Sequence, residues 1–244
     1  MLAKKALIFP DPAIALSYYR VGRAYQFLTE HAKAEEWFYK CIEIDPGLTF
    51  APNAHRAFVQ IYLLQGNYQK ARNHIQKILS VAPHNLLGLR FAGLLELCVG
   101  NYEKAEKYYT KALEVVGEAK FGVQSAEKQE IYNSLGYILW KTGHQEEARN
   151  MFNQSLQLAR KAIEKGNEYP GVPINIAIIN SIQGKKSEAY KWMEKAIDAG
   201  WRQYAWSLKN PLLENLHNDD RFQKMMAKVK NMVDEMRKRV EKEL

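Results

Sequence analysis

The spacing of hydrophobic positions around Gly66 predicts two helices joined by a short turn. Apolar side chains recur three or four residues apart on both sides of this glycine: Phe58, Val59, Tyr62, Ala71, Ile75 and Ile78. That interval keeps the side chains on one face of an α-helix. A glycine between two such runs favours a left-handed residue, which ends the first helix at little conformational cost.

The same pattern returns along the chain. GNYQKA at 66–71 is followed by GNYEKA at 100–105, which is 34 residues later. The register of small, bulky and turn positions fits five stretches, and an interval of this size is the length of a two-helix repeat. Glycines that we expect to end first helices are Gly66, Gly100, Gly143 and Gly184.

Small residues recur at matched positions of the two helices. The first helices carry Gly22, Val59, Gly93, Gly136 and Ala177, and the second helices carry Ala34, Ala71, Ala105, Ala148 and Ala189. We expect these small residues to face one another, so that the helix axes approach to about 8–10 Å. Larger residues on the second helices, such as Phe38 and Tyr109, are then expected to fill the space between units. One pair cannot bury its apolar face alone, so stacking would complete the core.

The combined pattern resembles the tetratricopeptide repeat (TPR) family. Its order is an aromatic residue or Leu, then Leu-Gly, Tyr, Gly, Ala, an aromatic residue, Ala and Pro. The resemblance implies an all-α fold, a right-handed α-solenoid of about five helix-turn-helix units with a C-terminal capping helix. The expected units lie at about 15–48, 52–85, 86–119, 129–166 and 170–203.

The tail departs from the repeat. We divide the chain into a repeat array at 1–203 and a region at 204–244 with a short helix and a long capping helix. Apolar residues of the long helix fall three or four apart in one stripe: Phe222, Met225, Met226, Val229, Met232, Val233, Met236 and Val240. Covering the last repeat is the favoured role of this helix. A homodimer through its methionine-rich end is the alternative.

The tail also resembles the C-terminal end of bacterial TPR proteins that often carry an N-terminal signalling domain. The opening AKKALIFP resembles the end of a second helix from a preceding unit. Together these resemblances imply that the chain was cut from a longer protein.

Composition bounds the class of protein. Of 244 residues, 47% are hydrophobic, which is ordinary for a folded protein, and no apolar run reaches the length of a bilayer span. The opening residues show neither a long apolar core nor a small-residue cleavage site, which argues against a signal peptide, so we expect a cytoplasmic protein unless the chain is a fragment that has lost its targeting segment. Cys41 and Cys98 fall on apolar helical positions, which indicates core residues. The net charge of +8 permits acidic partners without requiring them.

Catalytic chemistry is not indicated. Gly88 and Gly93 have phosphate-loop spacing, but Leu94 and Leu95 follow where Lys and Ser or Thr are required. The six histidines form no metal-binding pair of known spacing. We therefore expect no catalytic residue, no cofactor and no metal.

The best candidates for function lie on the first helix of each unit, which lines the concave side in the TPR family. Outward positions there define an expected partner-binding groove: Tyr19, Arg23, Arg56, Gln60, Arg90, Asn133, Tyr137 and Trp140. Arg56 and Arg90 are equivalent residues of adjacent units, and arginine forks match carboxylates bidentately. The alternative is that these arginines are solvated or paired with neighbouring acids.

The leading hypothesis is a protein-protein interaction scaffold that binds a peptide in this groove. The carboxylate clamp of some TPR proteins is not reproduced, because Tyr19 replaces its first Lys and Ala57 its second Asn. One alternative is a docking or sensory module of a larger signalling protein. Another is an RNA-binding helical repeat, which we rank below the first two because stacking residues are not evident and a nucleic-acid partner is not expected.

Overall fold

The computed structural model describes residues 12–46, 50–118 and 125–243, which form helices and turns without a strand. The all-α class predicted from the sequence is confirmed for these residues. The expectation about the opening AKKALIFP falls on residues outside the described part. Contacts divide the chain into two compact units, Met1–Phe91 and Ala92–Leu244, and each is described by itself.

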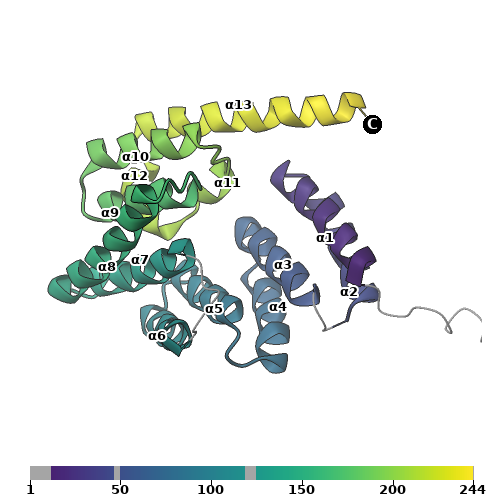
Figure 1. The fold of residues 1–244 in the computed structure, drawn as a ribbon, viewed down its shortest axis with the longest axis horizontal. Coiled ribbons are helices and arrows are strands. Elements are labelled where there is room, and N and C mark those ends of the chain that lie inside the picture. Colours follow the sequence, from purple (N-terminus) through teal and green to yellow (C-terminus); the bar gives the residue numbers. More distant parts are fainter. Residues whose placement is uncertain (1–11, 47–49, 119–124, 244) are drawn as a thin grey trace, which may run out of the picture. The chain divides into compact units, whose positions relative to one another are not determined.

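The first unit contains two antiparallel helix pairs (Figure 1). Its helices are α1 (Pro12–Phe27), α2 (His31–Ile44), α3 (Ala51–Gln65), α4 (Tyr68–Val81) and the beginning of α5 (Leu86–Cys98). Helix α3 packs against α2 as well as against α4, so the two pairs share one apolar layer.

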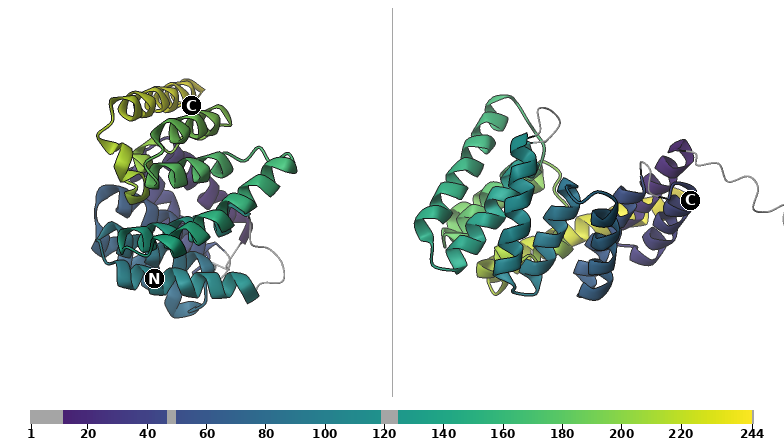
Figure 2. Two further views of the ribbon diagram at one scale, coloured as in Figure 1. Left: turned by 90° about the vertical axis from the view of Figure 1, so that its left-hand side faces the viewer. Right: turned by 90° about the horizontal axis from the view of Figure 1, so that it is seen from below.

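The second unit holds the remaining pairs and the tail (Figure 2). Its helices are α6 (Tyr102–Glu118), α7 (Ser125–Lys141), α8 (Gln145–Glu164), α9 (Gly171–Ile182), α10 (Lys186–Asp198), α11 (Tyr204–Ser207), α12 (Glu214–His217) and α13 (Asp220–Glu243). A 3-10 turn, η1 (Pro211–Leu213), precedes α12. The expected boundary between array and tail at 203/204 remains a prediction, although the tail belongs to the same compact unit as the later repeats.

One turn geometry joins the helices of all five pairs. At the second pair, the amide of Gly66 donates to Leu63 O at 3.1 Å and that of Asn67 to Tyr62 O at 2.8 Å. These two bonds satisfy the last carbonyls of the first helix in a Schellman motif. The same two bonds recur at residues 29 and 30, 100 and 101, 143 and 144, and 184 and 185.

The turn residue itself is left-handed, as predicted. The φ angle is 71° at Gly66, 76° at Gly100, 88° at Gly143 and 73° at Gly184. The first pair has Thr29 at this place, with φ 63°, a conformation that is unfavourable for a β-branched residue. The following asparagine of the repeated GNY segment then caps the second helix, since Asn67 Oδ1 accepts from the Lys70 amide at 3.2 Å.

The packing of the first-helix glycines differs from the expectation that small residues of the two helices face one another. The five second-helix alanines are all fully buried, but the nearest side chain to Gly22, Gly93 and Gly136 is the aromatic ring 16 residues later. A Cβ at Gly136 would lie 2.4 Å from Phe152 Cε1, and one at Gly93 would lie 2.7 Å from the Tyr109 ring. These rings therefore pack against the first-helix glycines inside the pair, and the Phe38 ring also meets that of Phe58 in the next pair, with centroids 5.7 Å apart, as expected for a residue between units.

The tail packs on the last repeat. Arg221 at the start of α13 pairs with Glu194 of α10 at 2.9 Å and stacks its guanidinium on Tyr190. Four residues of the predicted stripe are fully or almost fully buried: Phe222, Met226, Val229 and Val233. Val240 near the end of the helix is 38% exposed. The dimer through this end stays a prediction.

Candidate functional site

Four of the expected groove residues meet on α1 and α3 in the first unit. The Arg56 guanidinium donates to the Tyr19 hydroxyl, and Arg23 Nη1 donates to Gln60 Oε1 at 3.0 Å. Tyr19 and Arg56 hold the same position in successive pairs, as do Arg23 and Gln60. The repeat therefore places equivalent residues of neighbouring first helices in direct contact.

Gln26 completes this set, which we call the α1–α3 polar face: Tyr19, Arg23, Gln26, Arg56 and Gln60. Gln26 Nε2 donates to Ala57 O and to Gln60 Oε1, both at 3.3 Å, and Gln26 Oε1 accepts from Arg23. All five side chains are half-buried. Side chains fixed by mutual hydrogen bonds lose less conformational entropy when a partner binds.

The guanidinium of Arg56 is held by a neutral partner. It bonds the Tyr19 hydroxyl, and no ion pair to a described carboxylate accompanies that bond. Arg90 lies half-buried on α5 at the equivalent position of the next pair. The α1–α3 polar face thus carries positive charge and keeps the Arg56 guanidinium available to anionic groups.

Two expected groove residues of the second unit are buried, so the expectation that they face outward is wrong. Asn133 is 1% exposed, and its Nδ2 donates to Asn175 O at 3.1 Å and to Asn175 Oδ1 at 3.3 Å. The Asn133–Asn175 pair joins α7 to α9 inside the core.

Tyr137, the other buried residue of the expected groove, is 3% exposed. Burial, followed by hydrogen bonds to Tyr102 and Glu214, raises the pKa of its hydroxyl. Trp140 is half-buried, with its ring 6.3 Å from that of Phe152.

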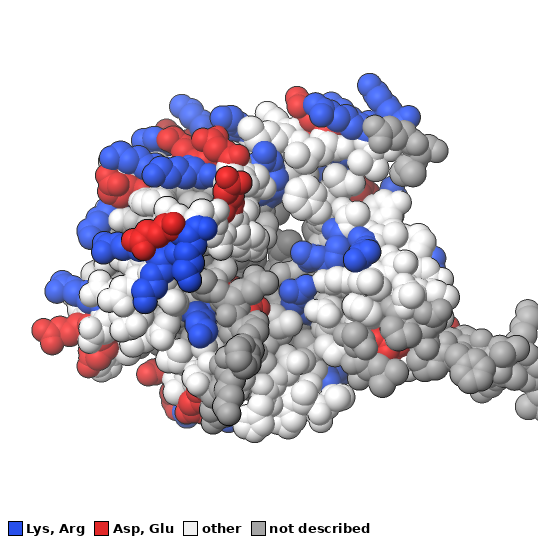
Figure 3. Space-filling model, in the orientation of Figure 1, with Lys and Arg blue, Asp and Glu red and all other residues white. Residues whose placement is uncertain are grey.

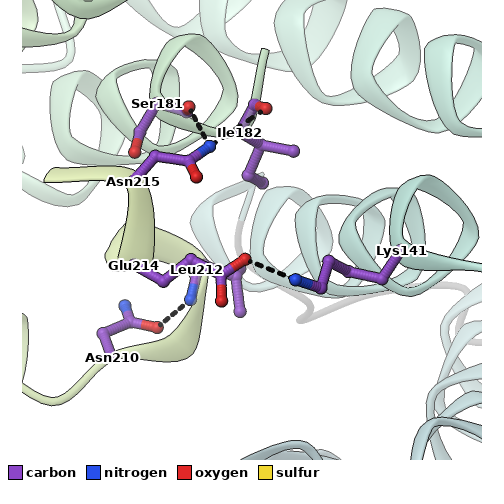
Figure 4. Close-up of polar contacts among 7 residues, drawn as sticks. All are labelled: Lys141, Ser181, Ile182, Asn210, Leu212, Glu214 and Asn215. Carbon is purple, nitrogen blue, oxygen red and sulfur yellow. Dashed lines mark hydrogen bonds and ion pairs between the residues drawn. The ribbon is translucent and has the colours of Figure 1, made fainter. Parts of the chain in front are cut away.

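The tail itself covers this part of the first helices. Asn215 Nδ2 donates to Ser181 O at 2.9 Å and Ile182 O at 3.4 Å at the end of α9 (Figure 4). Lys141 at the end of α7 pairs with Glu214 at 2.9 Å. The leucines of this segment are buried beneath these contacts: Leu212, Leu213 and Leu216. The tail segment therefore reduces the surface that the ends of α7 and α9 offer to a partner.

The distribution of charge along the sequence gives a signal that the repeat pattern alone did not show. Residues 46–95 contain no Asp or Glu, while they contain five basic residues: Arg56, Lys70, Arg72, Lys77 and Arg90. This stretch supplies α3, α4 and most of α5. By contrast, charges of both signs interleave over α10 and the start of α13 (Figure 3). The second pair is therefore a local source of excess positive charge.

Nucleophile and metal chemistry find little support in the described part of the chain. Burial raises the pKa of Cys41 to about 11 and that of Cys98 to about 12, so both remain neutral thiols near pH 7. Among described residues, no three His, Cys, Asp or Glu side chains are grouped to hold a metal ion. None of the described helices is both long and apolar enough to cross a bilayer.

Comparison with known proteins gives a family and a fold. Models of the tetratricopeptide repeat match residues 15–48, 57–85 and 86–161, which together exceed half of the chain. A comparison with curated proteins gives no match.

Two similar solved structures show the same fold. One is reported as PilF of Pseudomonas aeruginosa: it is 18% identical, with a TM-score of 0.55, over 90% of this chain and 92% of that one. The other is PilW, described as a type IV pilus biogenesis factor: it is 15% identical, with a TM-score of 0.51, over 91% and 94% of the two chains. The repeated turns, the matched small and bulky residues and the family models agree, and the chain belongs to the tetratricopeptide repeat family.

Proposed function

We propose that this chain is a protein-interaction scaffold whose α1–α3 polar face, continued by Arg90, binds an acidic segment of a partner protein. The observation that carries the proposal is the Arg56 guanidinium, which is oriented by the neutral Tyr19 hydroxyl within a stretch that lacks acidic residues. A guanidinium so placed can take a carboxylate bidentately without first breaking an ion pair.

The remainder of the face supports the same class of partner. Gln26 and Gln60 present amide groups that can bond the main chain of an extended peptide. The later first helices are less suited, because Asn133 and Tyr137 are buried and the tail segment covers their surroundings. We therefore assign partner binding to the earlier helix pairs, and such binding requires no catalytic group.

Selection from a random peptide display library on the full chain tests the proposal. We expect the selected peptides to be enriched in Asp and Glu, and the variant Arg56→Glu with Arg90→Glu to lose them. Matched charge reversal at two exposed arginines of α8, Arg149→Glu with Arg160→Glu, should retain them. Circular dichroism checks that both variants fold. Equal loss in the two variants, or selected peptides without acidic residues, would contradict the assignment of the face.

A further inference from the structure

A separate feature of the first unit lies between α2 and α4. Tyr39, Tyr62, Lys70, Asn73, His74, Gln76, Lys77 and Ser80 line an open cavity of about 520 Å³. None of these residues belongs to the α1–α3 polar face. We propose that this cavity, the α2–α4 cavity, is a second binding site, which takes a peptide segment with two carboxylates flanking an apolar side chain.

The floor of the cavity is aromatic and uncharged. Tyr39 is 54% exposed, and its ring centroid lies 4.6 Å from that of Phe58 beneath it. Tyr62 and His74 are buried, at 2% and 7% exposure, and their rings pack together. Burial lowers the pKa of His74 to about 4, so the imidazole is neutral near pH 7. The open ring of Tyr39, supported by the packed rings beneath it, can cover an apolar side chain.

The rim of the cavity is basic. Lys70 and Lys77 are exposed residues of α4, two helical turns apart, which separates their Cα atoms by about 10.5 Å. The Lys70 ammonium lies 5.2 Å from the centre of the Tyr62 ring, and neither lysine forms an ion pair with a described acid. Glu35 of α2 accepts a hydrogen bond from Tyr62, but it does not line the cavity.

A second cavity makes the contrast clear. The cavity of about 740 Å³ between α10 and α13 is lined by three acids and three bases: Glu194, Asp198, Asp220, Arg221, Lys224 and Lys228. Arg221 and Glu194 are paired there at 2.9 Å. Its charges offset one another, whereas the α2–α4 cavity carries lysines with no acid in its lining. Of these two cavities, the α2–α4 cavity is the one whose lining is complementary to an acidic ligand.

The residue types favour a peptide over nucleic acid. Single-stranded nucleic acid binds through exposed aromatic faces on which successive bases stack. Here the rings of Tyr62 and His74 are buried, and only Tyr39 is open. In an extended peptide, side chains two apart share a face, so Glu-x-Phe-x-Glu places both carboxylates and the ring on one side over about 13 Å. Flexible lysine side chains can span that length.

The test uses the full chain and a labelled peptide, Gly-Glu-Ala-Phe-Ala-Glu-Gly, with binding followed by amide chemical shifts. We expect shifts concentrated in α2 and α4, and an affinity reduced about tenfold or more by Lys70→Glu with Lys77→Glu. The matched control is Lys104→Glu with Lys111→Glu, the equivalent exposed lysines of α6, where Glu103 pairs with Lys107. This control should change the affinity less than about twofold.

Two altered peptides test the separate contributions of the carboxylates and of the apolar side chain. Replacing both glutamates of the peptide by glutamine should abolish the shifts, and replacing its phenylalanine by glycine should weaken them. Shifts that persist with the glutamine peptide, equal losses in both lysine pairs, or tighter binding of a single-stranded 12-nucleotide probe at α4 would overturn the proposal. Arg56→Glu should leave this binding unchanged, so the two sites are tested independently.

Discussion

The glycine-to-ring packing of the first, third and fourth helix pairs predicts the outcome of a single added methyl group. In Gly136→Ala, the new Cβ would lie 2.4 Å from Phe152 Cε1, 2.7 Å from Cδ1 and 3.0 Å from Cζ. Carbon atoms in proteins are normally about 3.5–4.0 Å apart, so the ring must move by roughly 1 Å. Phe152 is fully buried, and the close packing of protein interiors resists such a movement.

The magnitude follows from two opposing effects. Overpacking a core costs about 1–3 kcal/mol, while exchanging glycine for alanine inside a helix gains about 0.5–1 kcal/mol. Gly117→Ala is the matched control, because Gly117 lies on the exposed side of α6, where an added Cβ would enter open space. We expect Gly136→Ala to be less stable than Gly117→Ala by about 1–3 kcal/mol in urea unfolding followed by circular dichroism.

A compensating pair sharpens this prediction. The second helix pair already carries Val59 and Ile75 where the fourth carries Gly136 and Phe152. The double variant Gly136→Val with Phe152→Ile should therefore be more stable than the sum of its single variants by about 1 kcal/mol or more. Additive effects in the double variant, or equal stability of Gly136→Ala and Gly117→Ala, would refute the packing account.

Three further predictions concern stability. Thr29→Gly should stabilise the fold by about 0.5–1 kcal/mol, because it relieves a left-handed threonine, while Gly66→Thr should destabilise it; thermal melting compares the two. His55 and His74 have Nδ1 atoms 2.9 Å apart, and burial lowers the pKa of each to about 4. Both are neutral when folded but protonate near pH 6.5 when unfolded, so their contribution to stability should be constant above that pH and fall between about pH 6.5 and 4. His55→Phe with His74→Phe should flatten this dependence in urea titrations at several pH values. Leu213→Ala in the buried tail segment should cost about 2–5 kcal/mol of unfolding free energy, and a loss below about 1 kcal/mol would show that the tail is loosely held.

The local features of this fold could be predicted from the sequence. The turn glycines, the buried alanines and the helix spacing all depend on residues a few positions apart, so the repeat shows them directly. Gly66 and Gly143 are left-handed as expected. The prediction that a small residue packs beside each of the first-helix glycines was wrong. Sequence spacing does not show which of two buried residues, such as Ala148 or Phe152, fills the space beside Gly136.

The groove was harder to predict, since exposure depends on distant segments. Position in the repeat alone places Tyr137 outward, but Glu214, which pairs with the neighbouring Lys141, is 73 residues from that lysine. Nothing local in the sequence indicates that the tail returns to this point. Tyr19 and Arg56 are equivalent residues of successive pairs, and they meet directly as the repeat implies.

Binding of a selected acidic peptide to the full chain, measured by calorimetry beside Arg56→Gln, tests the central claim most directly. Glutamine removes the charge while keeping a polar side chain, so a carboxylate contact would be lost without burial of a new charge. The account predicts an affinity weaker by about tenfold or more for this variant and an unchanged affinity for Arg149→Gln. Equal affinities for the three proteins would contradict it.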